Sequence, residues 1–280
     1  MKPAAFRYER PDTVDETVDL LANLGDEAKV LAGGQSLVPM MNFRLARPEA
    51  IIDIGRVPGI DQIRVSDGVV GIGARVRHQQ LLRRPFDGPL QDLFLQAGRH
   101  IGHLPIRLRG TFGGSIAHAD PVAEWCLVAL ALDAEVVVRS VRGERTISLA
   151  ELFEMSFTTT IADDELLTEV RVPLLADDWS TGFAEFSRRT GDFAVVAIAT
   201  AVRVQNGLVT EAKVAAGGVA GTPIRLPATE ASLIGGPLDA VSISTAGEIA
   251  SSEVQPRADI HGSSMYRREL VAAMTRRALQ

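Results

Sequence analysis

Two short segments that pair glycines with a hydroxyl residue place the strongest constraint on how this chain folds. The first reads Ala32-Gly33-Gly34-Gln35-Ser36-Leu37, and the second reads Thr111-Phe112-Gly113-Gly114-Ser115-Ile116. Each lies between an apolar strand candidate and a following helix or apolar stretch. Glycine lets the backbone approach a ligand closely and leaves N–H groups free to point at anionic oxygens. Two such loops, about 80 residues apart, predict a shared phosphate site, with ordinary tight turns as the alternative.

Neither segment fits the two best-known nucleotide-binding patterns. Both lack the dinucleotide fingerprint G-x-G-x-x-G and the terminal Lys-Ser/Thr of the P-loop, which disfavours a Rossmann domain and a P-loop NTPase. The single cysteine, Cys126, excludes an internal disulfide and a cysteine-ligated zinc or iron–sulfur centre in this chain, because such sites need several thiolates. The histidines are scattered without metal-ligand spacing, and nothing resembles a base–nucleophile pair. We therefore predict no metal site and no catalytic residue.

Charge and hydropathy limit the classes of partner that this chain can bind. The 280 residues carry 29 basic and 35 acidic side chains, and the net charge of −6 argues against a general binder of nucleic acid or anionic membranes. No uninterrupted apolar run reaches the ~20 residues that span a bilayer. The stretch from Met1 to Arg10 lacks the apolar core of a secretory signal. We expect a cytoplasmic protein without a membrane span.

The order of the predicted elements indicates an α+β fold in two domains. A strand–glycine turn–helix–strand unit fills about residues 1–57, and hairpins mixed with helices fill 58–175, which together form a first domain of residues 1–175. An acidic, polar stretch at 174–180 marks the start of a second domain, 176–280. Three strand candidates, 182–188, 195–205 and 208–217, form its antiparallel sheet and precede three helices; Asn206-Gly207 predicts a tight turn.

Several motifs resemble one known family in the same order along the chain. They are AGGQSLVPMM at 32–41 with Arg47-Pro48 and Ile52-Asp53-Ile54, RGTFGGS at 109–115 continuing through HADP at 118–121, ELLTE at 165–169, RRTGDFA at 188–194, and DIHG at 259–262. This pattern is similar to that of the FAD-binding medium subunits of molybdenum hydroxylases. The family includes the medium subunit of carbon monoxide dehydrogenase and the flavin domain of xanthine dehydrogenase.

The resemblance implies a fold, a cofactor and partners. The fold is a p-cresol methylhydroxylase-type FAD-binding domain of two α+β subdomains, followed by the smaller domain with its three-stranded sheet. The two glycine turns are expected to clamp the FAD diphosphate. A large subunit is expected to hold molybdopterin, and a small subunit with two [2Fe–2S] clusters to pass electrons to the flavin, which suits this junction because it takes electrons singly and releases them in pairs. We expect a dimer of such heterotrimers and an external final acceptor.

The resemblance also carries a set of cofactor-binding residues onto this chain. They are Lys29, Val30, Leu31, Ala32, Gly33, Gly34, Gln35, Ser36, Leu37, Ile101, Thr111, Gly113, Gly114, Ser115, His118, Asp120, Glu124, Leu167 and Phe193. Each has a plainer interpretation beside the functional one. Lys29 can be a solvated lysine at a strand end, Glu124 an exposed acid at a helix start, and Asp120 a helix N-cap.

Ile101 and Leu167 are implied to pack on the flavin or adenine rings, and Phe193 to lie beside the isoalloxazine, although each can equally be an ordinary core residue. One departure is visible. Similar proteins often carry lysine near Glu185, where a cation would stabilise reduced flavin, so the redox tuning of this chain is open.

Two other functions stay possible from the sequence. One is a stand-alone flavin oxidase or reductase on the same fold, which would turn over a small substrate without partners. The other is a non-enzymatic partner-binding subunit in which the glycine turns are only turns. The substrate cannot be read from this chain, since the large subunit would select it.

Overall fold

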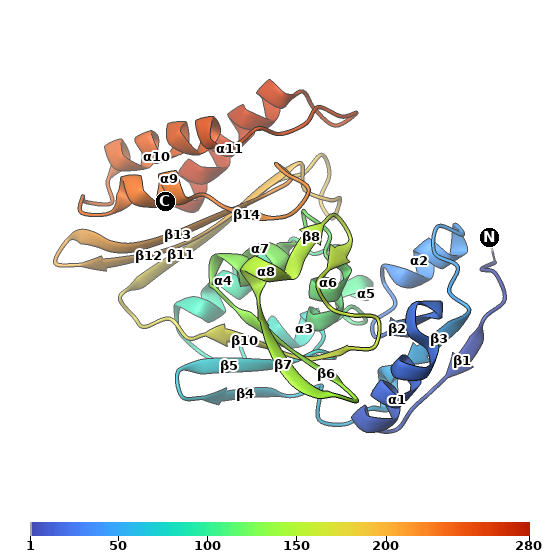
Figure 1. Cartoon of the computed structure of the whole chain (residues 1–280). Coiled ribbons are helices and arrows are strands. Elements are labelled where there is room, and N and C mark those ends of the chain that lie inside the picture. Colours follow the sequence, from blue (N-terminus) through green and yellow to red (C-terminus); the bar gives the residue numbers. More distant parts are fainter. Residues whose placement is uncertain (1) are drawn as a thin grey trace.

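The computed structural model describes residues 2–280 and confirms the α+β class. Three units follow one another along the chain (Figure 1), from a small N-terminal unit in blue, through a central unit in cyan to yellow, to a C-terminal unit in orange and red. Each is built on its own sheet, with strand orders β1-β3-β2, β4-β5-β10-β6-β7 and β11-β12-β13-β14. Within residues 2–280, no helix is long and apolar enough to cross a membrane.

The N-terminal unit is a parallel three-stranded sheet with helices between its strands. Its elements are β1 (Arg7–Glu9), α1 (Val14–Leu24), η1 (Gly25–Glu27), β2 (Ala28–Leu31), α2 (Leu37–Asn42), β3 (Ala50–Asp53) and η2 (Ile54–Arg56). Thr13 caps α1 by accepting a hydrogen bond from the Glu16 N–H, as the spacing of these two residues predicts. β3 lies between β1 and β2 and is parallel to both. The carboxyl end of β2 leads directly into the first glycine segment.

The central unit combines an antiparallel five-stranded sheet with short helices. Its elements are β4 (Ile63–Ser66), β5 (Val69–Gly73), α3 (His78–Leu81), α4 (Pro89–Gly98), α5 (Leu104–Arg107), α6 (Phe112–His118), α7 (Glu124–Ala131), β6 (Glu135–Ser140), β7 (Gly143–Ser148), α8 (Leu149–Leu152), β8 (Phe153–Met155), β9 (Thr158–Thr159) and β10 (Leu166–Pro173). The sequence predicts a buried helix at 121–132, and α7 is that helix, because every residue from Trp125 to Ala131 is buried. A helix without a polar face must lie between other layers.

Three aromatic side chains fix the position of the helix that carries the second glycine segment. The Trp125 ring of α7 lies 5.1 Å from the Phe94 ring of α4 and 5.3 Å from the Phe112 ring of α6, measured between centroids. All three side chains are completely buried. Aromatic rings at this separation contribute packing energy beyond their buried area. The start of α6 is therefore anchored in the central core.

The C-terminal unit has one more strand than the sequence predicts. Its elements are β11 (Trp179–Phe186), β12 (Val196–Gln205), β13 (Leu208–Gly217), β14 (Ile224–Arg225), α9 (Pro227–Leu233), α10 (Ala240–Glu253) and α11 (Ser264–Ala278). The expected three-stranded sheet is in fact four-stranded, because β14 pairs with β13. Two residues are too few for any alternation of apolar side chains to reveal such a strand. The predicted turn at Asn206-Gly207 is present, with positive φ at both residues.

The C-terminal sheet is apolar on both faces. One face, which includes Ala184, Val196 and Ile198, belongs to the core that the C-terminal helices cover. The opposite face contributes Phe183, Ala197, Ala199, Ala201 and Ala215 to the core of the central unit, against α4 and α7. Alternation of side chains along each strand produces this division. The two units therefore share a core, and Figure 1 shows the sheet between the central helices and α9–α11.

Candidate functional site

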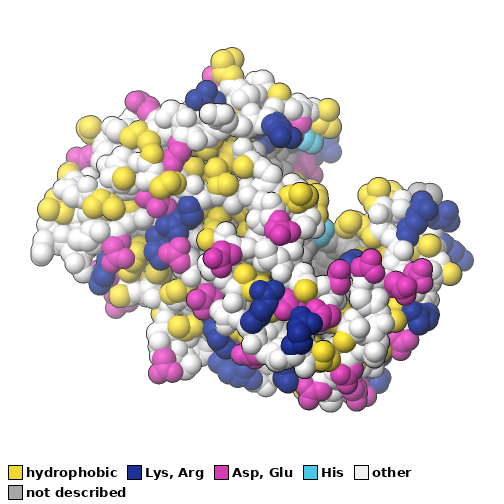
Figure 2. Space-filling view, in the orientation of Figure 1, with side chains coloured by type: hydrophobic (Ala, Val, Ile, Leu, Met, Phe, Trp, Pro, Cys, Tyr) yellow, Lys and Arg dark blue, Asp and Glu magenta, His cyan; other side chains and the backbone are white. Residues whose placement is uncertain are grey.

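A cavity of about 680 Å³ lies where the N-terminal and central units meet. Figure 2 shows the surface hollowed between the lobe that contains the N-terminus and the rest of the molecule. The cavity collects all the predicted cofactor-binding residues except Leu31. Those it collects are Lys29, Val30, Ala32, Gly33, Gly34, Gln35, Ser36, Leu37, Ile101, Thr111, Gly113, Gly114, Ser115, His118, Asp120, Glu124, Leu167 and Phe193. Segments that are distant in the sequence thus line one cavity.

Leu31 is the exception. The Leu31 side chain lines a separate recess with Phe6, Tyr8 and Val38. The Leu31 side chain therefore lies outside the cavity that the other predicted residues line.

The first glycine segment is an open turn between β2 and α2. Gly34 has a φ of +72°, a conformation that residues with a Cβ rarely adopt. The Gln35 side-chain amide donates a hydrogen bond to the Gly33 carbonyl oxygen at 3.1 Å. Within residues 2–280, no hydrogen-bond acceptor is recorded for the backbone N–H groups from Gly33 to Leu37. The turn therefore presents a run of free donors at the edge of the cavity.

The second glycine segment is not the turn that the sequence predicts. Phe112, Gly113, Gly114 and Ser115 form the first turn of α6, and Thr111 is its N-cap. The Thr111 hydroxyl accepts a hydrogen bond from the Gly114 N–H at 3.1 Å, and the Ser115 N–H donates to the Thr111 carbonyl oxygen at 3.0 Å. A glycine pair disfavours helix in isolation, but this cap and the buried Phe112 ring compensate.

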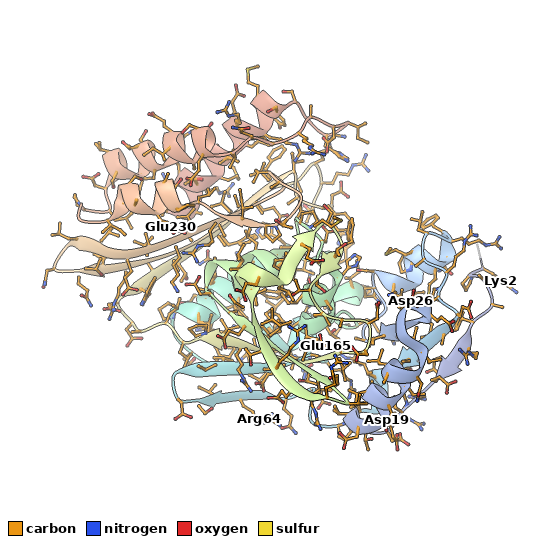
Figure 3. The ribbon with its side chains drawn as sticks, in the orientation of Figure 1. Lys2, Asp19, Asp26, Arg64, Glu165 and Glu230 are labelled. Carbon is orange, nitrogen blue, oxygen red and sulfur yellow. The ribbon has the colours of Figure 1, made fainter. Side chains whose placement is uncertain are left out.

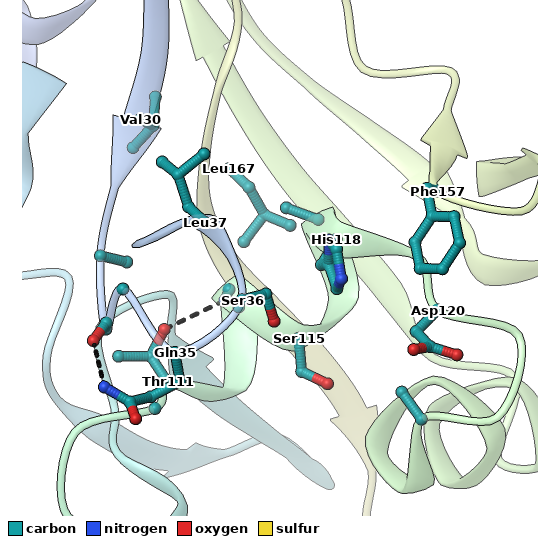
Figure 4. Close-up of a pocket in the computed structure, with 18 of the residues that line it drawn as sticks. Val30, Gln35, Ser36, Leu37, Thr111, Ser115, His118, Asp120, Phe157 and Leu167 are labelled. Carbon is teal, nitrogen blue, oxygen red and sulfur yellow. Dashed lines mark hydrogen bonds between the residues drawn. The ribbon is translucent and has the colours of Figure 1, made fainter. Parts of the chain in front are cut away.

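The two segments approach each other as closely as backbone atoms allow. A Cβ placed on Gly33 would lie 2.4 Å from the Arg109 carbonyl oxygen and 2.7 Å from the Gly110 Cα, so only glycine fits there. The Ser36 and Ser115 side chains both line the cavity, and Figure 4 shows them on the two segments. This arrangement fits an anionic diphosphate, because neutral N–H and O–H donors converge on one space that backbone contact keeps narrow.

Oppositely charged side chains from the N-terminal and central units lie close together beside the first glycine segment. The Lys29 ammonium lies 3.6 Å from the Asp163 carboxylate, and both side chains are about half exposed, so water screens the pair. The nearby Glu165 carboxylate is buried and accepts two hydrogen bonds of 2.7 Å from the Arg145 guanidinium. This pairing holds the pKa of Glu165 below its usual range. Figure 3 shows Glu165 inside the molecule, near the boundary with the N-terminal unit.

Asp163 and Glu165 line the cavity, yet the sequence does not single them out individually as site residues. Their partners Lys29 and Arg145 are far away in the chain, and no local spacing joins them.

An aromatic pair forms another part of the wall. The His118 ring lies 5.1 Å from the Phe157 ring, and burial lowers the pKa of His118. Phe157 has a φ of +62° and donates its N–H to the Ala119 carbonyl oxygen at 2.9 Å. A bulky residue in this conformation is strained and persists only where surrounding contacts hold it. Phe157 is a further residue that sequence reasoning misses, because the segment around it has no periodic pattern.

The start of α7 closes the cavity on the side of the C-terminal unit. Asp120 is not the expected N-cap of this helix, because Ala123 occupies that position and Asp120 instead accepts a hydrogen bond from the Val122 N–H at 3.0 Å. Burial raises the pKa of Asp120. Burial, and secondarily the Glu185 carboxylate, raise the pKa of Glu124 to about 8. Glu124 is therefore not the exposed acid of the alternative interpretation.

Apolar residues complete the walls. Ile101 and Leu167 are largely buried and line the cavity, whereas Phe193, from the β11–β12 loop, is 77% exposed and is not a core aromatic. His78 also lines the cavity; its Nδ1 accepts a hydrogen bond from the Trp125 indole at 2.9 Å, and burial lowers its pKa to about 4. Neutral His78 thus ties the cavity floor to the aromatic core.

The family follows from two matches that together span nearly the whole chain. Residues 4–175 match the family described as the FAD binding domain in molybdopterin dehydrogenase, and residues 181–280 match the CO dehydrogenase flavoprotein C-terminal domain. The chain belongs to this flavoprotein family. The resemblance inferred from the motifs, the α+β fold and FAD as the cofactor are thereby confirmed.

Relatives of the flavoprotein match it end to end. The 6-hydroxypseudooxynicotine dehydrogenase complex subunit alpha of Paenarthrobacter nicotinovorans is 42% identical over 100% of this chain and 95% of its own length. The nicotine 6-hydroxylase medium subunit of the same organism is 38% identical over 100% of this chain and 98% of its own. The structure of carbon monoxide dehydrogenase from Hydrogenophaga pseudoflava matches with a TM-score of 0.96 and 35% identity, covering 100% of this chain and 97% of that one.

Proposed function

We propose that the flavoprotein holds FAD in the cavity between its N-terminal and central units, with the diphosphate between the two glycine segments. The proposal rests on the contact of Gly33 with Arg109 and Gly110, which brings a run of free N–H donors against the start of α6. Ile101 and Leu167 offer apolar surface to the rings, and Glu124 can accept hydrogen bonds from hydroxyls. The cofactor-binding residues are the predicted set without the side chain of Leu31.

Bound FAD supplies a centre that takes electrons singly and releases them in pairs. The chain's own part is to bind and orient that centre. Its single cysteine, Cys126, is buried, and iron–sulfur clusters require several thiolates. In this proposal the electrons arrive from [2Fe–2S] clusters on a small subunit and leave to an external acceptor.

The chain is one subunit of a larger assembly in this proposal. A large subunit carries molybdopterin, the small subunit carries the clusters, and two such heterotrimers form a dimer in the cytoplasm. The names of the relatives, a complex subunit and a medium subunit, support a multi-subunit enzyme. The division into an FAD-binding domain at 1–175, with subdomains at about 1–57 and 58–175, and a second domain at 176–280 completes the proposal.

Substrate selection belongs to another subunit. Relatives whose names carry nicotine-type substrates and a structure named for carbon monoxide both match this chain over its whole length. Substrates so different in chemistry are not selected by a subunit that keeps one architecture. The cavity of this chain accordingly serves the cofactor.

Purification of the full chain, alone and with its co-purifying proteins, tests the proposal. We expect a yellow protein with one FAD per chain, no turnover by the chain alone, and co-purification with a molybdenum-containing subunit and an iron–sulfur subunit. A colourless protein that cannot be reconstituted with FAD would contradict the proposed site. Turnover of a small substrate by the isolated chain would instead indicate a stand-alone flavin enzyme.

A further inference from the structure

The turn between β8 and β9 carries a phenyl ring that neither turn geometry nor core packing explains. Met155 of β8 pairs with Thr158 of β9, and the two residues between them, Ser156 and Phe157, form the turn. Phe157 has a φ of +62°, and glycine or asparagine usually occupies a turn position of this kind. A side chain with a Cβ is costly there. Phe157 is also 56% exposed, so burial in the core does not offset that cost.

Hydrogen bonds on two sides hold this turn in place. The Phe157 N–H donates to the carbonyl oxygen of Ala119, which ends α6, at 2.9 Å. The Ser156 hydroxyl donates to the carbonyl oxygen of Gly221, in the C-terminal unit, at 2.8 Å. The turn is therefore fixed between α6 and the C-terminal unit. Contacts of this kind allow a strained backbone conformation to persist, and such strain is concentrated at binding sites.

The Phe157 ring lines the cavity at the end of α6. This helix starts beside the first glycine segment and ends at His118, and its seven residues span about 10 Å. Figure 4 shows Phe157 and Asp120 on one side of the pocket and Gln35 and Thr111 on the other. Phe157 thus lies about one short helix away from the proposed diphosphate position.

Part of the Phe157 ring is free to contact a ligand. Its recorded aromatic neighbour within residues 2–280 is His118, whose ring is tilted by 41° to it at a centroid distance of 5.1 Å. A tilted neighbour on one side leaves ring surface uncovered, in agreement with the exposure of the residue. An exposed phenyl ring gains free energy when a second flat ring covers it, because apolar surface leaves water and the rings attract each other.

The isoalloxazine is the ring of FAD that fits this end of the cavity. FAD extends from its diphosphate in two directions, to isoalloxazine and to adenine. Among the described lining residues, the phenylalanine, tyrosine and tryptophan side chains are Phe157 and Phe193, which is 77% exposed on the β11–β12 loop. Both lie on the side of the C-terminal unit, where the cavity is open. Isoalloxazine must be reached by the partners that exchange electrons with it, whereas adenine takes no part in that exchange.

We propose that Phe157 packs against the isoalloxazine ring of FAD and holds it at the end of the cavity beside the C-terminal unit. The turn keeps a strained phenylalanine in place of glycine because this contact forms only when the cofactor is bound. The inference rests on the proposed function, since it requires FAD in this cavity. It adds the β8–β9 turn to the binding residues predicted from the sequence, which include none from that turn.

Titration of the full chain tests the contact, with any subunits that purify with it and with its FAD removed. We expect Phe157→Gly to bind FAD about tenfold more weakly, which corresponds to about 1.4 kcal/mol, and Phe157→Tyr to keep the original affinity. ADP, which has no isoalloxazine, should bind Phe157→Gly and the unmodified chain equally. Met155→Ala is the matched control, because Met155 is 62% exposed in the same hairpin and does not line the cavity. It should leave both affinities unchanged.

Chemical denaturation without FAD separates a ligand contact from structural support. Glycine adopts a positive φ without strain, so the midpoint of Phe157→Gly should equal or exceed that of the unmodified chain. The midpoint of Phe157→Ala should be lower than that of Phe157→Gly, because alanine keeps the Cβ.

Three results would overturn the inference: unchanged FAD affinity in Phe157→Gly, an equal loss of ADP and FAD affinity in that variant, or a midpoint below that of the unmodified chain. The first would show no ring contact, the second would place Phe157 at the adenosine end, and the third would make it a structural residue. An unmodified chain that binds no FAD would instead contradict the proposed function, and this inference with it.

Discussion

The two glycine segments look alike in sequence, yet they are built differently. At 33–36 the backbone makes an open turn whose N–H groups are free, and Gly34 has a positive φ. At 113–115 the backbone is helical. The Gly114 N–H donates a hydrogen bond to the Thr111 hydroxyl, and the Ser115 N–H donates one to the Thr111 carbonyl oxygen. The first segment is therefore the richer source of donors. The second supplies the rigid surface against which the first is held.

Gly33 and Gly113 are required for different physical reasons. Gly33 is required because the backbone of Arg109 and Gly110 lies against it, which is a contact between segments. Gly113 is required because a Cβ would lie 2.6 Å from the Cα of Ala74, which is a contact within the central core. The same residue type thus serves ligand access in one segment and core packing in the other. Substitution at each position should separate these roles.

Gly113→Ala should have the largest effect, and the effect should be on folding. The added methyl group meets the Ala74 backbone, which cannot move aside as a side chain would. We expect a loss of about 3 kcal/mol in the free energy of unfolding, the upper range for overpacking a core. Chemical denaturation measures it. The control is Gly236→Ala, where a Cβ meets nothing within 4 Å; equal stability of the two variants would contradict the assignment.

Gly33→Ala should act mainly on the cofactor. The methyl group pushes the first segment away from Arg109 and Gly110, so the donors no longer face one space. A displacement that costs about 1–3 kcal/mol corresponds to about 5- to 150-fold weaker FAD binding. Quenching of FAD fluorescence measures the dissociation constant. Should Gly33→Ala bind FAD as the unmodified chain does while Gly113→Ala unfolds, the second segment alone would make the site.

Acid should weaken the second segment selectively, because neutral His78 supports it. The His78 ring packs on Gly110 and accepts the Trp125 hydrogen bond. Its pKa is about 4 in the folded chain against a usual 6.5, so between these values the unfolded chain binds a proton that the folded chain does not. Stability contributed by His78 is complete above about pH 6.5 and is lost as pH falls through about 4, by on the order of 3 kcal/mol in total.

Denaturation series at pH 7 and pH 5 check this expectation. The fall in stability between them should shrink in His78→Gln, which has no titrating ring. His261→Gln, at an exposed position, should keep the full pH dependence and serves as the control. A pH dependence unchanged in His78→Gln would place the acid-sensitive group elsewhere.

Local patterns predict much of this fold because the strongest elements are also the most regular. The Thr13 cap, the Asn206-Gly207 turn and the apolar helix α7 follow directly from short-range rules. The motifs that resemble the flavoprotein family place the cavity residues in one group, which the structure brings together apart from Leu31.

The features that sequence reasoning misses depend on contacts between distant residues. The helical form of Gly113-Gly114 depends on Phe112 packing in the aromatic core, which outweighs the low helix propensity of glycine. Phe157 reaches the cavity only because its backbone is held to Ala119. The burial of Glu185 depends on a sheet that packs on another unit. None of these contacts produces a periodic pattern in the sequence.

Substitution of the hydroxyl residues should also distinguish the two segments, one by a change in stability and the other by a change in FAD binding. These effects should be the smallest of those predicted. Thr111→Val removes the cap of α6 and should lower the free energy of unfolding by about 1 kcal/mol. Ser36 is exposed and makes no cap hydrogen bond with α2, so Ser36→Ala should change stability by less than about 0.5 kcal/mol.

Ser36→Ala should weaken FAD binding more than it changes stability. Loss of one hydroxyl donor to the diphosphate is worth about 1 kcal/mol, or about fivefold in the dissociation constant, without a matching change in stability. Denaturation and FAD titration of both variants on the same preparations give the two numbers. A Ser36→Ala variant that loses stability but keeps its FAD affinity would reverse the roles of the two segments, because the open turn would then be the structural support and the capped helix the main source of donors.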